Sequence, residues 1–121
     1  MDGDPGARVL VAADPADGAV LGTAKYLPNH PGTGAHVANA SFVVALDASG
    51  RGVVRTLAQA VLDGARADGY RATQFNAVVE INDRAVRLWL SLGFVVLAAV
   101  PEAFDHPTAG LVGLHMMHRT L

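Results

Sequence analysis

The chain has 121 residues, of which 51% are hydrophobic and 17% charged, which suits one domain and is too short for two of ordinary size. It contains no cysteine, which excludes a disulfide scaffold, a zinc ribbon and a cysteine nucleophile and fits a reducing, cytoplasmic location. The net charge is -2 and the nine basic residues are dispersed, so we expect no nucleic-acid binding. The longest apolar run, 94–100, is far below the roughly 20 residues that cross a bilayer, and the first residues lack the pattern of a signal peptide, so we expect no membrane association.

The first third of the chain predicts an antiparallel hairpin followed by another strand. Residues 8–13 and 20–26 are strand-like, and residues 14–18 supply the turn between them. Residues 27–34 contain two prolines and two glycines, so a loop is expected there. The next strand is predicted over 36–46.

The rest of the chain alternates helices with strands. One helix face is predicted from six apolar residues at helical spacing, namely Val54, Leu57, Ala58, Val61, Leu62 and Ala65. Gly69 suits the left-handed residue that ends this helix, and a strand follows over 72–80. Asn82 is a candidate cap for a second helix, 83–91, which Gly93 would end. Two final strands, 94–100 and 110–120, are expected to pair antiparallel around a loop, 101–109. The pattern indicates an α/β (α+β mixed) fold, a mixed sheet with helices packed on it.

A glycine-rich turn between the third strand and the first helix is a candidate phosphate site. The turn carries Gly50 and Gly52 and leads directly into the helix, whose first N–H groups lack partners at the positive end of the helix dipole. Arg51 and Arg55 add charge that can reach phosphate oxygens. The alternative is a tight turn with two solvated arginines. The motifs of a nucleoside triphosphate loop and of a dinucleotide site are absent.

The segment 41–94 resembles the GNAT superfamily of acetyl-CoA-dependent N-acetyltransferases. The resemblance lies in the order of strand, glycine-rich turn, helix and strand, followed by Asn82, Ala85, Leu88 and Gly93-Phe94. The family motif Arg/Gln-x-x-Gly-x-Gly/Ala falls on residues 49–54, with Gly52 at its first glycine. The resemblance implies a single GNAT-like domain over 1–121, with a twisted mixed sheet, two main helices and a cofactor-binding portion at 41–94. It also implies that the usual leading strand and two helices are missing.

The same resemblance implies transfer of an acetyl group from acetyl-CoA to an amine of a small molecule or peptide, without a metal. It implies that the pantetheine arm pairs with the backbone of Phe42, Val43 and Val44. The pyrophosphate would be held by Gly50, Arg51, Gly52, Val53, Val54 and Arg55. Asn82 would approach the cofactor, and a plain helix cap is the alternative for it.

Acetylation of an amine requires a hydrogen-bond donor to the oxyanion and a base that deprotonates the amine, and the thiolate must then leave with or without a proton. A backbone N–H near Val44 is the expected donor. Trp89 occupies the catalytic position where the family commonly has a tyrosine that protonates the thiolate. An indole cannot give up its proton at neutral pH, so Tyr70 or water is expected to substitute.

Four residues are candidates for the base that deprotonates the amine. Glu80 ends the strand 72–80, and a solvated strand end is its alternative. His36 starts the third strand and is the second candidate. His115 and His118 lie at an odd spacing on opposite faces of the last strand, so they are not expected to form a metal pair. For each histidine, a structural role is the alternative.

A second hypothesis belongs to another class of protein. Ser49 and Val54 depart from the first motif and Trp89 departs from the second, which fits a catalytically weakened or truncated relative that acts as a CoA-binding or protein-interaction module. An uncovered sheet edge would favour a homodimer. The segment 101–107, which carries Glu102, Asp105 and His106 in the predicted loop, is either a selector of cationic acceptors or solvated.

Overall fold

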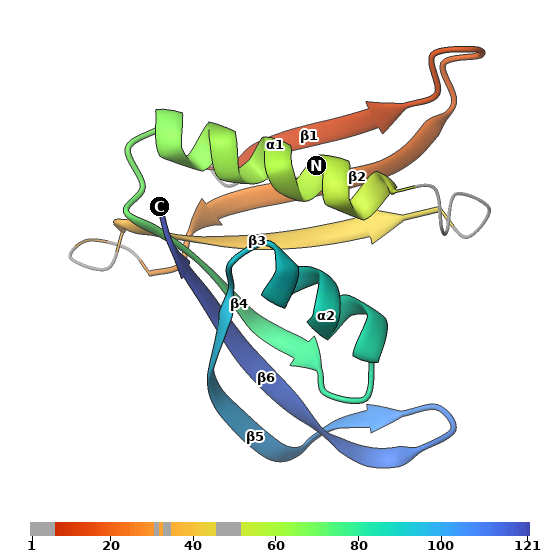
Figure 1. Ribbon diagram of the computed structural model, residues 1–121, viewed down its shortest axis with the longest axis vertical. Coiled ribbons are helices and arrows are strands. Elements are labelled where there is room, and N and C mark those ends of the chain that lie inside the picture. The colour runs from red at the N-terminus through yellow and green to blue at the C-terminus, as the bar shows by residue number, and fades with distance from the viewer. Residues whose placement is uncertain (1–6, 31, 33–34, 46–51) are drawn as a thin grey trace. The chain divides into compact units, whose positions relative to one another are not determined.

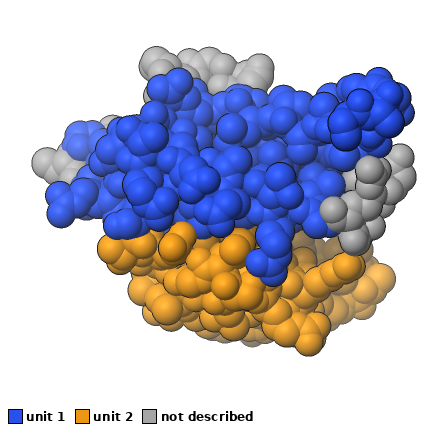
Figure 2. All heavy atoms as spheres, turned by 45° about the horizontal axis from the view of Figure 1, so that its top comes forward, with its two compact units in different colours: residues 1–73, 121 blue, residues 74–120 orange. Residues whose placement is uncertain are grey.

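The computed structural model describes residues 7–30, 32, 35–45 and 52–121. The described residues form six strands and two helices in an α+β arrangement, which can be followed in Figure 1. The chain divides into two compact units, residues 1–73 with Leu121 (unit 1) and residues 74–120 (unit 2), coloured separately in Figure 2. In chain order the elements are β1 (Arg8–Ala13), β2 (Val20–Pro28), β3 (Val37–Val44), α1 (Val53–Ala67), β4 (Ala72–Val79), α2 (Asp83–Ser91), β5 (Val95–His106) and β6 (Gly110–Thr120).

Unit 1 contains the predicted hairpin and its neighbouring strand. β1 pairs antiparallel with β2, and β2 pairs antiparallel with β3. Between β1 and β2 the side chain of Asp14 accepts a hydrogen bond from the Ala16 N–H at 2.9 Å, and Gly18 has φ 75°. The turn therefore forms where the sequence predicted it.

The predicted loop 27–34 is wrong at its start, because β2 continues to Pro28, which pairs with Ala38 of β3. Proline lacks only the N–H donor, so it is tolerated at the last position of a strand where that donor is not needed. β3 is shorter than predicted, and the predicted end at Leu46 lies outside the described residues.

Helix α1 contacts all three strands of unit 1 (Figure 1). Its buried residues are Val53, Leu57, Ala58, Val61, Leu62 and Ala65. Val54, predicted on this face, is only half-buried, and Val53 takes the buried place. The reason is the four-residue ridge that Val53 starts with Leu57 and Val61. Gly69 follows the helix with φ 90°, as predicted.

The end of α1 is tied to the hairpin of unit 1 by a buried tyrosine. Tyr26 is 3% exposed, and its hydroxyl donates to Asp68 Oδ2 at 2.8 Å. Arg8 Nε lies 3.2 Å from the same carboxylate oxygen. Burial, together with the hydrogen bond to Asp68, raises the pKa of Tyr26 to about 12.

Unit 2 has the strand order β4-β6-β5, and the predicted antiparallel pairing of the last two strands is confirmed. Its core is an aromatic cluster of Phe75 from β4, Trp89 from α2, and Phe94. The ring centroid of Phe75 lies 4.5 Å from that of Trp89 and 4.4 Å from that of Phe94. The cluster therefore fixes α2 against β4.

The predicted loop 101–109 is wrong, because β5 continues to His106 and only residues 107–109 connect it to β6. The pairing is interrupted between Val100 and Phe104, where Glu102 has φ 53°, and resumes at Phe104 opposite Val112. β5 is an edge strand of unit 2, so Pro101 and an irregular backbone can be accommodated without breaking the strand. Among the residues that the structure describes, no helix is long and apolar enough to span a membrane.

Candidate active site

The start of α1 in unit 1 has backbone groups that suit an anion. Gly52 precedes the helix with φ 74°, no side chain caps the first turn, and that turn carries no acidic residue. The Gly52 carbonyl accepts from both the N–H and the hydroxyl of Thr56, at 3.0 and 3.1 Å. The N–H groups of a first helical turn have no partner within the helix and lie at its positive end. This turn therefore fits a phosphate or pyrophosphate group.

Access to this turn is open on the described side. A Cβ added to Gly52 would meet no atom within 4 Å, and both Gly52 and Arg55 are exposed. Val53 faces the core and Val54 is half-buried, so they would contribute backbone groups to a bound anion. Two other predicted ligands, Gly50 and Arg51, lie outside the described residues.

The three predicted pantetheine residues lie at the end of β3. Phe42, Val43 and Val44 pair with Ala24, Thr23 and Gly22 of β2. Val43 is 72% exposed, which leaves an apolar side chain in solvent at the strand end that leads toward α1. Their pairing with a cofactor stays a prediction.

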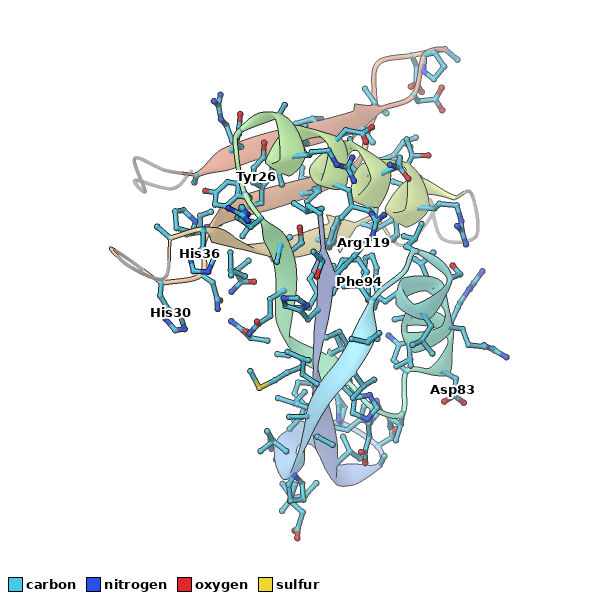
Figure 3. All side chains as sticks on the ribbon, turned by 60° about the vertical axis from the view of Figure 1, so that its left-hand side comes forward. Tyr26, His30, His36, Asp83, Phe94 and Arg119 are labelled. Carbon is cyan, nitrogen blue, oxygen red and sulfur yellow. The ribbon has the colours of Figure 1, made fainter. Side chains whose placement is uncertain are left out.

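His36 lies at the opposite end of β3 (Figure 3). It is exposed, and its carbonyl accepts from the Arg71 N–H at 2.8 Å. Val44 is eight residues further on, about 26 Å at roughly 3.3 Å per strand residue. A base acts within hydrogen-bond reach, directly or through one water. His36 and an oxyanion donor at Val44 therefore cannot serve the same carbonyl, and the structure does not bring these two predicted residues together.

Glu80, immediately after β4 in unit 2, holds its carboxylate against β6. The Glu80 N–H donates to the Gly113 carbonyl at 3.0 Å, and the Gly113 N–H donates to Glu80 Oε1 at 3.1 Å. The second oxygen, Oε2, lies 3.9 Å from Nε2 of His115, and the Glu80 side chain is 41% exposed. One carboxylate oxygen is thus hydrogen-bonded to the backbone, and the other is directed toward an imidazole.

Sequence reasoning missed the link between Glu80, Gly113 and His115. The sequence assigns no role to Gly113, and it offers His115 as a separate candidate base and not as a neighbour of Glu80. The three residues meet because β4 lies beside β6, and nothing local in the sequence states that pairing. Over the described part of the chain, no group of three or more His, Cys, Asp or Glu is placed to hold a metal ion.

Asn82 has the capping geometry that the sequence predicted. Its Oδ1 accepts from the Ala85 N–H at 3.2 Å, which satisfies one free donor at the start of α2. This hydrogen bond supports the cap. The approach of Asn82 to a cofactor stays a prediction.

Trp89 is 6% exposed and lies in the aromatic cluster of unit 2. A buried ring in this cluster has a packing role, so the structure gives no support to Trp89 as a catalytic group. Tyr70, the suggested substitute acid, packs edge-on against Tyr26 with centroids 6.1 Å apart. Burial raises the pKa of Tyr70, which makes this phenol a weaker proton donor than usual.

The three residues suggested as an acceptor-selecting loop belong to the β5–β6 hairpin instead. Glu102 and Asp105 lie within β5. His106 uses Nδ1 to accept from the N–H groups of Thr108 and Ala109, at 3.2 and 3.1 Å. This histidine therefore closes the turn.

These features define an α+β protein with an open, uncapped helix start in unit 1 and an oriented carboxylate in unit 2. The family model of the acetyltransferase (GNAT) family matches residues 2–94. The chain belongs to this family. The predicted fold, a mixed sheet with two helices, is confirmed by the structural relatives described next.

Three relatives illustrate the range of similarity. A GCN5-related N-acetyltransferase of Kribbella flavida is 60% identical, with a TM-score of 0.94 over 100% of this chain and 71% of that one. The yncA protein of Salmonella typhimurium, solved with its cofactor acetyl-CoA, is 27% identical, with a TM-score of 0.82 over 93% of this chain and 64% of that one. The N-acetyltransferase aca1 of Schizosaccharomyces pombe is 33% identical over 84 residues, which are 69% of this chain and 40% of the relative. The chain thus spans less than half the length of that curated relative.

Proposed function

We propose that this chain transfers the acetyl group of acetyl-CoA to an amine of a small molecule or peptide. The observation that carries the proposal is the start of α1, where Gly52 in the left-handed conformation leads into an uncapped first turn without acidic residues. It lies within the segment matched by the family model. The Salmonella relative, whose fold is similar, has acetyl-CoA as its cofactor.

In this proposal the residues of unit 1 bind the donor. The first-turn N–H groups of α1 hold the pyrophosphate, with charge from Arg55 and, in the preceding segment, from Arg51, while Gly50 leaves room for the anion. The backbone of 42–44 pairs with the pantetheine arm, and a backbone N–H near Val44 stabilises the oxyanion. Bound acetyl-CoA supplies the activated acetyl group and a thiolate leaving group.

In unit 2, Glu80 is our candidate base. An ammonium ion cannot attack a thioester until it loses a proton. Glu80 Oε1 accepts a hydrogen bond from the Gly113 N–H, whereas Oε2 lies 3.9 Å from His115 Nε2 and accepts no hydrogen bond from the residues that the structure describes. Oε2 is therefore the oxygen that takes the proton from the acceptor amine. His36 is the weaker candidate because it lies at the far end of β3 from Val44.

Self-association and a cytoplasmic location are further parts of the proposal. β1 is an edge strand of unit 1 with Val9 and Val11 exposed, and β5 is an edge strand of unit 2. Exposed apolar edges favour pairing with a second copy. We expect a homodimer, which sedimentation velocity at several protein concentrations would detect. A mass of 12.5 kDa at every concentration would contradict it.

The experiment that tests acetyl transfer is incubation with acetyl-CoA and a panel of amines, with release of free thiol as the readout. Saturating acetyl-CoA should also stabilise the fold, by about 2.7 kcal/mol at 100 times Kd. Stabilisation without turnover on any amine would instead support the CoA-binding module. The absence of both stabilisation and turnover would contradict the proposal.

A matched pair of substitutions tests the helix start. Asn and Asp both tolerate the left-handed conformation of Gly52 better than other residues do, and they differ mainly in charge. Gly52→Asp should weaken acetyl-CoA binding at least about tenfold relative to Gly52→Asn, because a carboxylate repels the pyrophosphate. The same charge favours the helix dipole, so the free Gly52→Asp protein should be no less stable than the Gly52→Asn protein. Equal affinities in the two variants would place the pyrophosphate elsewhere.

A further inference from the structure

The carboxylate of Glu80 is held in one position by two residues of β6. Gly113 provides an N–H to Oε1 at 3.1 Å and a carbonyl to the Glu80 N–H at 3.0 Å. His115, two residues further along the same strand, directs Nε2 toward Oε2 at 3.9 Å. The two carboxylate oxygens therefore have different surroundings, both supplied by one short stretch of β6.

Gly113 is needed for this arrangement because of space. A Cβ on residue 113 would lie 2.5 Å from Glu80 Oε2 and 2.7 Å from its carboxyl carbon. No two such atoms approach so closely, so any other residue displaces the carboxylate. Gly113 is within β6 and its φ is not positive, so alanine suits its backbone. The displaced atoms are the far end of a flexible side chain, and their movement costs the fold little.

His115 has a chemical feature that packing does not explain. Its side chain is 20% exposed, and Nδ1 is buried without a hydrogen-bond partner among the described residues. A buried polar atom without a partner costs free energy, so an apolar residue would serve packing better. The reason for a histidine at this position is its Nε2, which faces Glu80 Oε2, the carboxylate oxygen that accepts no backbone hydrogen bond.

We propose that Gly113 and His115 are positioning residues that set the Glu80 carboxylate for the reaction, Gly113 by leaving room and holding Oε1, and His115 by orienting Oε2. This inference rests on the proposed function, because it assigns both residues to the candidate base of acetyl transfer. The proton moves from the acceptor ammonium to Oε2, and the freed amine nitrogen bonds to the acetyl carbon. The bond from that carbon to sulfur then breaks, its electron pair leaves with the sulfur as a thiolate, and the second proton lost by the nitrogen passes to that thiolate through water. Neither Gly113 nor His115 needs to touch the acceptor.

The kinetic test is a pair of double-mutant cycles on Glu80. Gly113→Ala should lower kcat by roughly 10- to 100-fold, the range expected when a reacting group is misplaced by about 1 Å, with a smaller effect on KM for acetyl-CoA. His115→Leu should also lower kcat, and His115→Gln, which keeps a nitrogen close to the place of Nε2, should recover most of it. In a Glu80→Gln background neither substitution should lower kcat further, because residues that act through one group are not additive.

The matched control is His30→Leu, a histidine-to-leucine change at an exposed position of unit 1 just after β2. Its kcat should stay within about twofold of the parent, as for an uncoupled surface substitution. Melting temperature is recorded for every variant. Losses of kcat that persist in the Glu80→Gln background would show that Gly113 and His115 act through the fold, and the positioning role would be wrong.

The remaining outcomes separate this inference from the proposed function. If Glu80→Gln leaves kcat unchanged in an active enzyme, acetyl transfer stands and the positioning role falls. If no amine is turned over, NMR on the full chain still tests whether the Glu80 carboxylate lies beside Gly113 and His115. Glu80→Ala should shift the Gly113 amide and the His115 ring resonances, whereas Glu102→Ala should not. Unchanged Gly113 and His115 resonances in Glu80→Ala would overturn the inference without reference to activity.

Discussion

The two units of this protein present chemistry in different ways. Unit 1 offers the start of α1, where the candidate binding groups are backbone N–H donors and the preceding residue, Gly52, has no side chain. Unit 2 offers Glu80, whose position depends on side-chain and backbone atoms of another strand. A backbone site tolerates many sequences as long as the helix begins at the same place. A side-chain site is lost by one substitution, so the units should respond differently to mutation.

The hydrophobic cores of the two units also differ in how many residues they depend on. The buried face of α1 in unit 1 is aliphatic and spread over four helical turns, so a single truncation removes a small part of it. Unit 2 relies on three rings, Phe75, Trp89 and Phe94, in mutual contact. Glu80 and Asn82 lie between the elements that these rings hold together, so the geometry of the candidate base depends on a few aromatic contacts.

The largest effect is expected for Phe75→Ala, because this ring contacts both other members of the aromatic cluster. Truncation of a buried phenylalanine costs about 3–5 kcal/mol of unfolding free energy. Denaturant titration measures it, with Leu62→Ala in unit 1 as the comparison at about 2–5 kcal/mol. A loss below about 1 kcal/mol for Phe75→Ala, the size of an average surface change, would mean that unit 2 does not depend on its rings.

Next in size is Glu80→Gln, which keeps the shape of the side chain and removes its basicity. Loss of a general base lowers kcat by about 10²–10⁴-fold, while acetyl-CoA affinity should hardly change because our proposal places the donor on unit 1. Glu102→Gln in β5 is the matched control and should keep full activity. Parallel losses of kcat and of acetyl-CoA affinity would contradict the separation of roles between the units.

Tyr26→Phe tests the tie between α1 and the hairpin in unit 1. Removing the hydroxyl should cost about 1.5–3 kcal/mol, the range for a hydrogen bond to a charged group. The folded pKa of Tyr26 is raised from 10.0 to about 12, so this stabilisation is complete below pH 10 and is lost as the pH rises through about 12. The stability difference between parent and Tyr26→Phe should therefore shrink between pH 9 and pH 12. A constant difference over this range would contradict the assignment.

The smallest effect is expected for Asn82→Ala, which removes the cap of α2 in unit 2. The loss should be about 1 kcal/mol, and Asn82→Asp should restore it because aspartate is an equally good cap. Acetyl-CoA affinity, measured by calorimetry on both variants, separates the two interpretations of Asn82. Unchanged affinity leaves a cap alone, and an affinity loss that Asn82→Asp fails to restore would assign the residue to the cofactor as well.

The helices and the first hairpin could be predicted from local signals. Helix α2 begins and ends at the predicted residues, and β6 matches its predicted bounds. Gly93 has the left-handed conformation, φ 90°, expected of a residue that ends a helix. These features follow from backbone sterics and side-chain caps, which act between residues close in sequence.

The predictions failed where proline and glycine signals met a paired strand. Pro101 marked a loop in the sequence, but β5 resumes its pairing at Phe104 because β6 supplies the partner. Pro28 was placed in a loop and lies in β2 because Ala38 pairs with it. A local breaker predicts an interruption, and only the partner strand decides whether the strand continues beyond it.

The same division applies to the candidate site. The sequence by itself determined the glycine before α1, the cap of α2 and the family of the chain, since each depends on residues close together or on an ordered motif. Only the tertiary structure decided that Trp89 is a core ring, and that Gly113 and His115 surround the Glu80 carboxylate. The physical reason is that the position of a carboxylate is set by the strand beside it, and strand pairing joins residues 33 positions apart with no local signal in either segment.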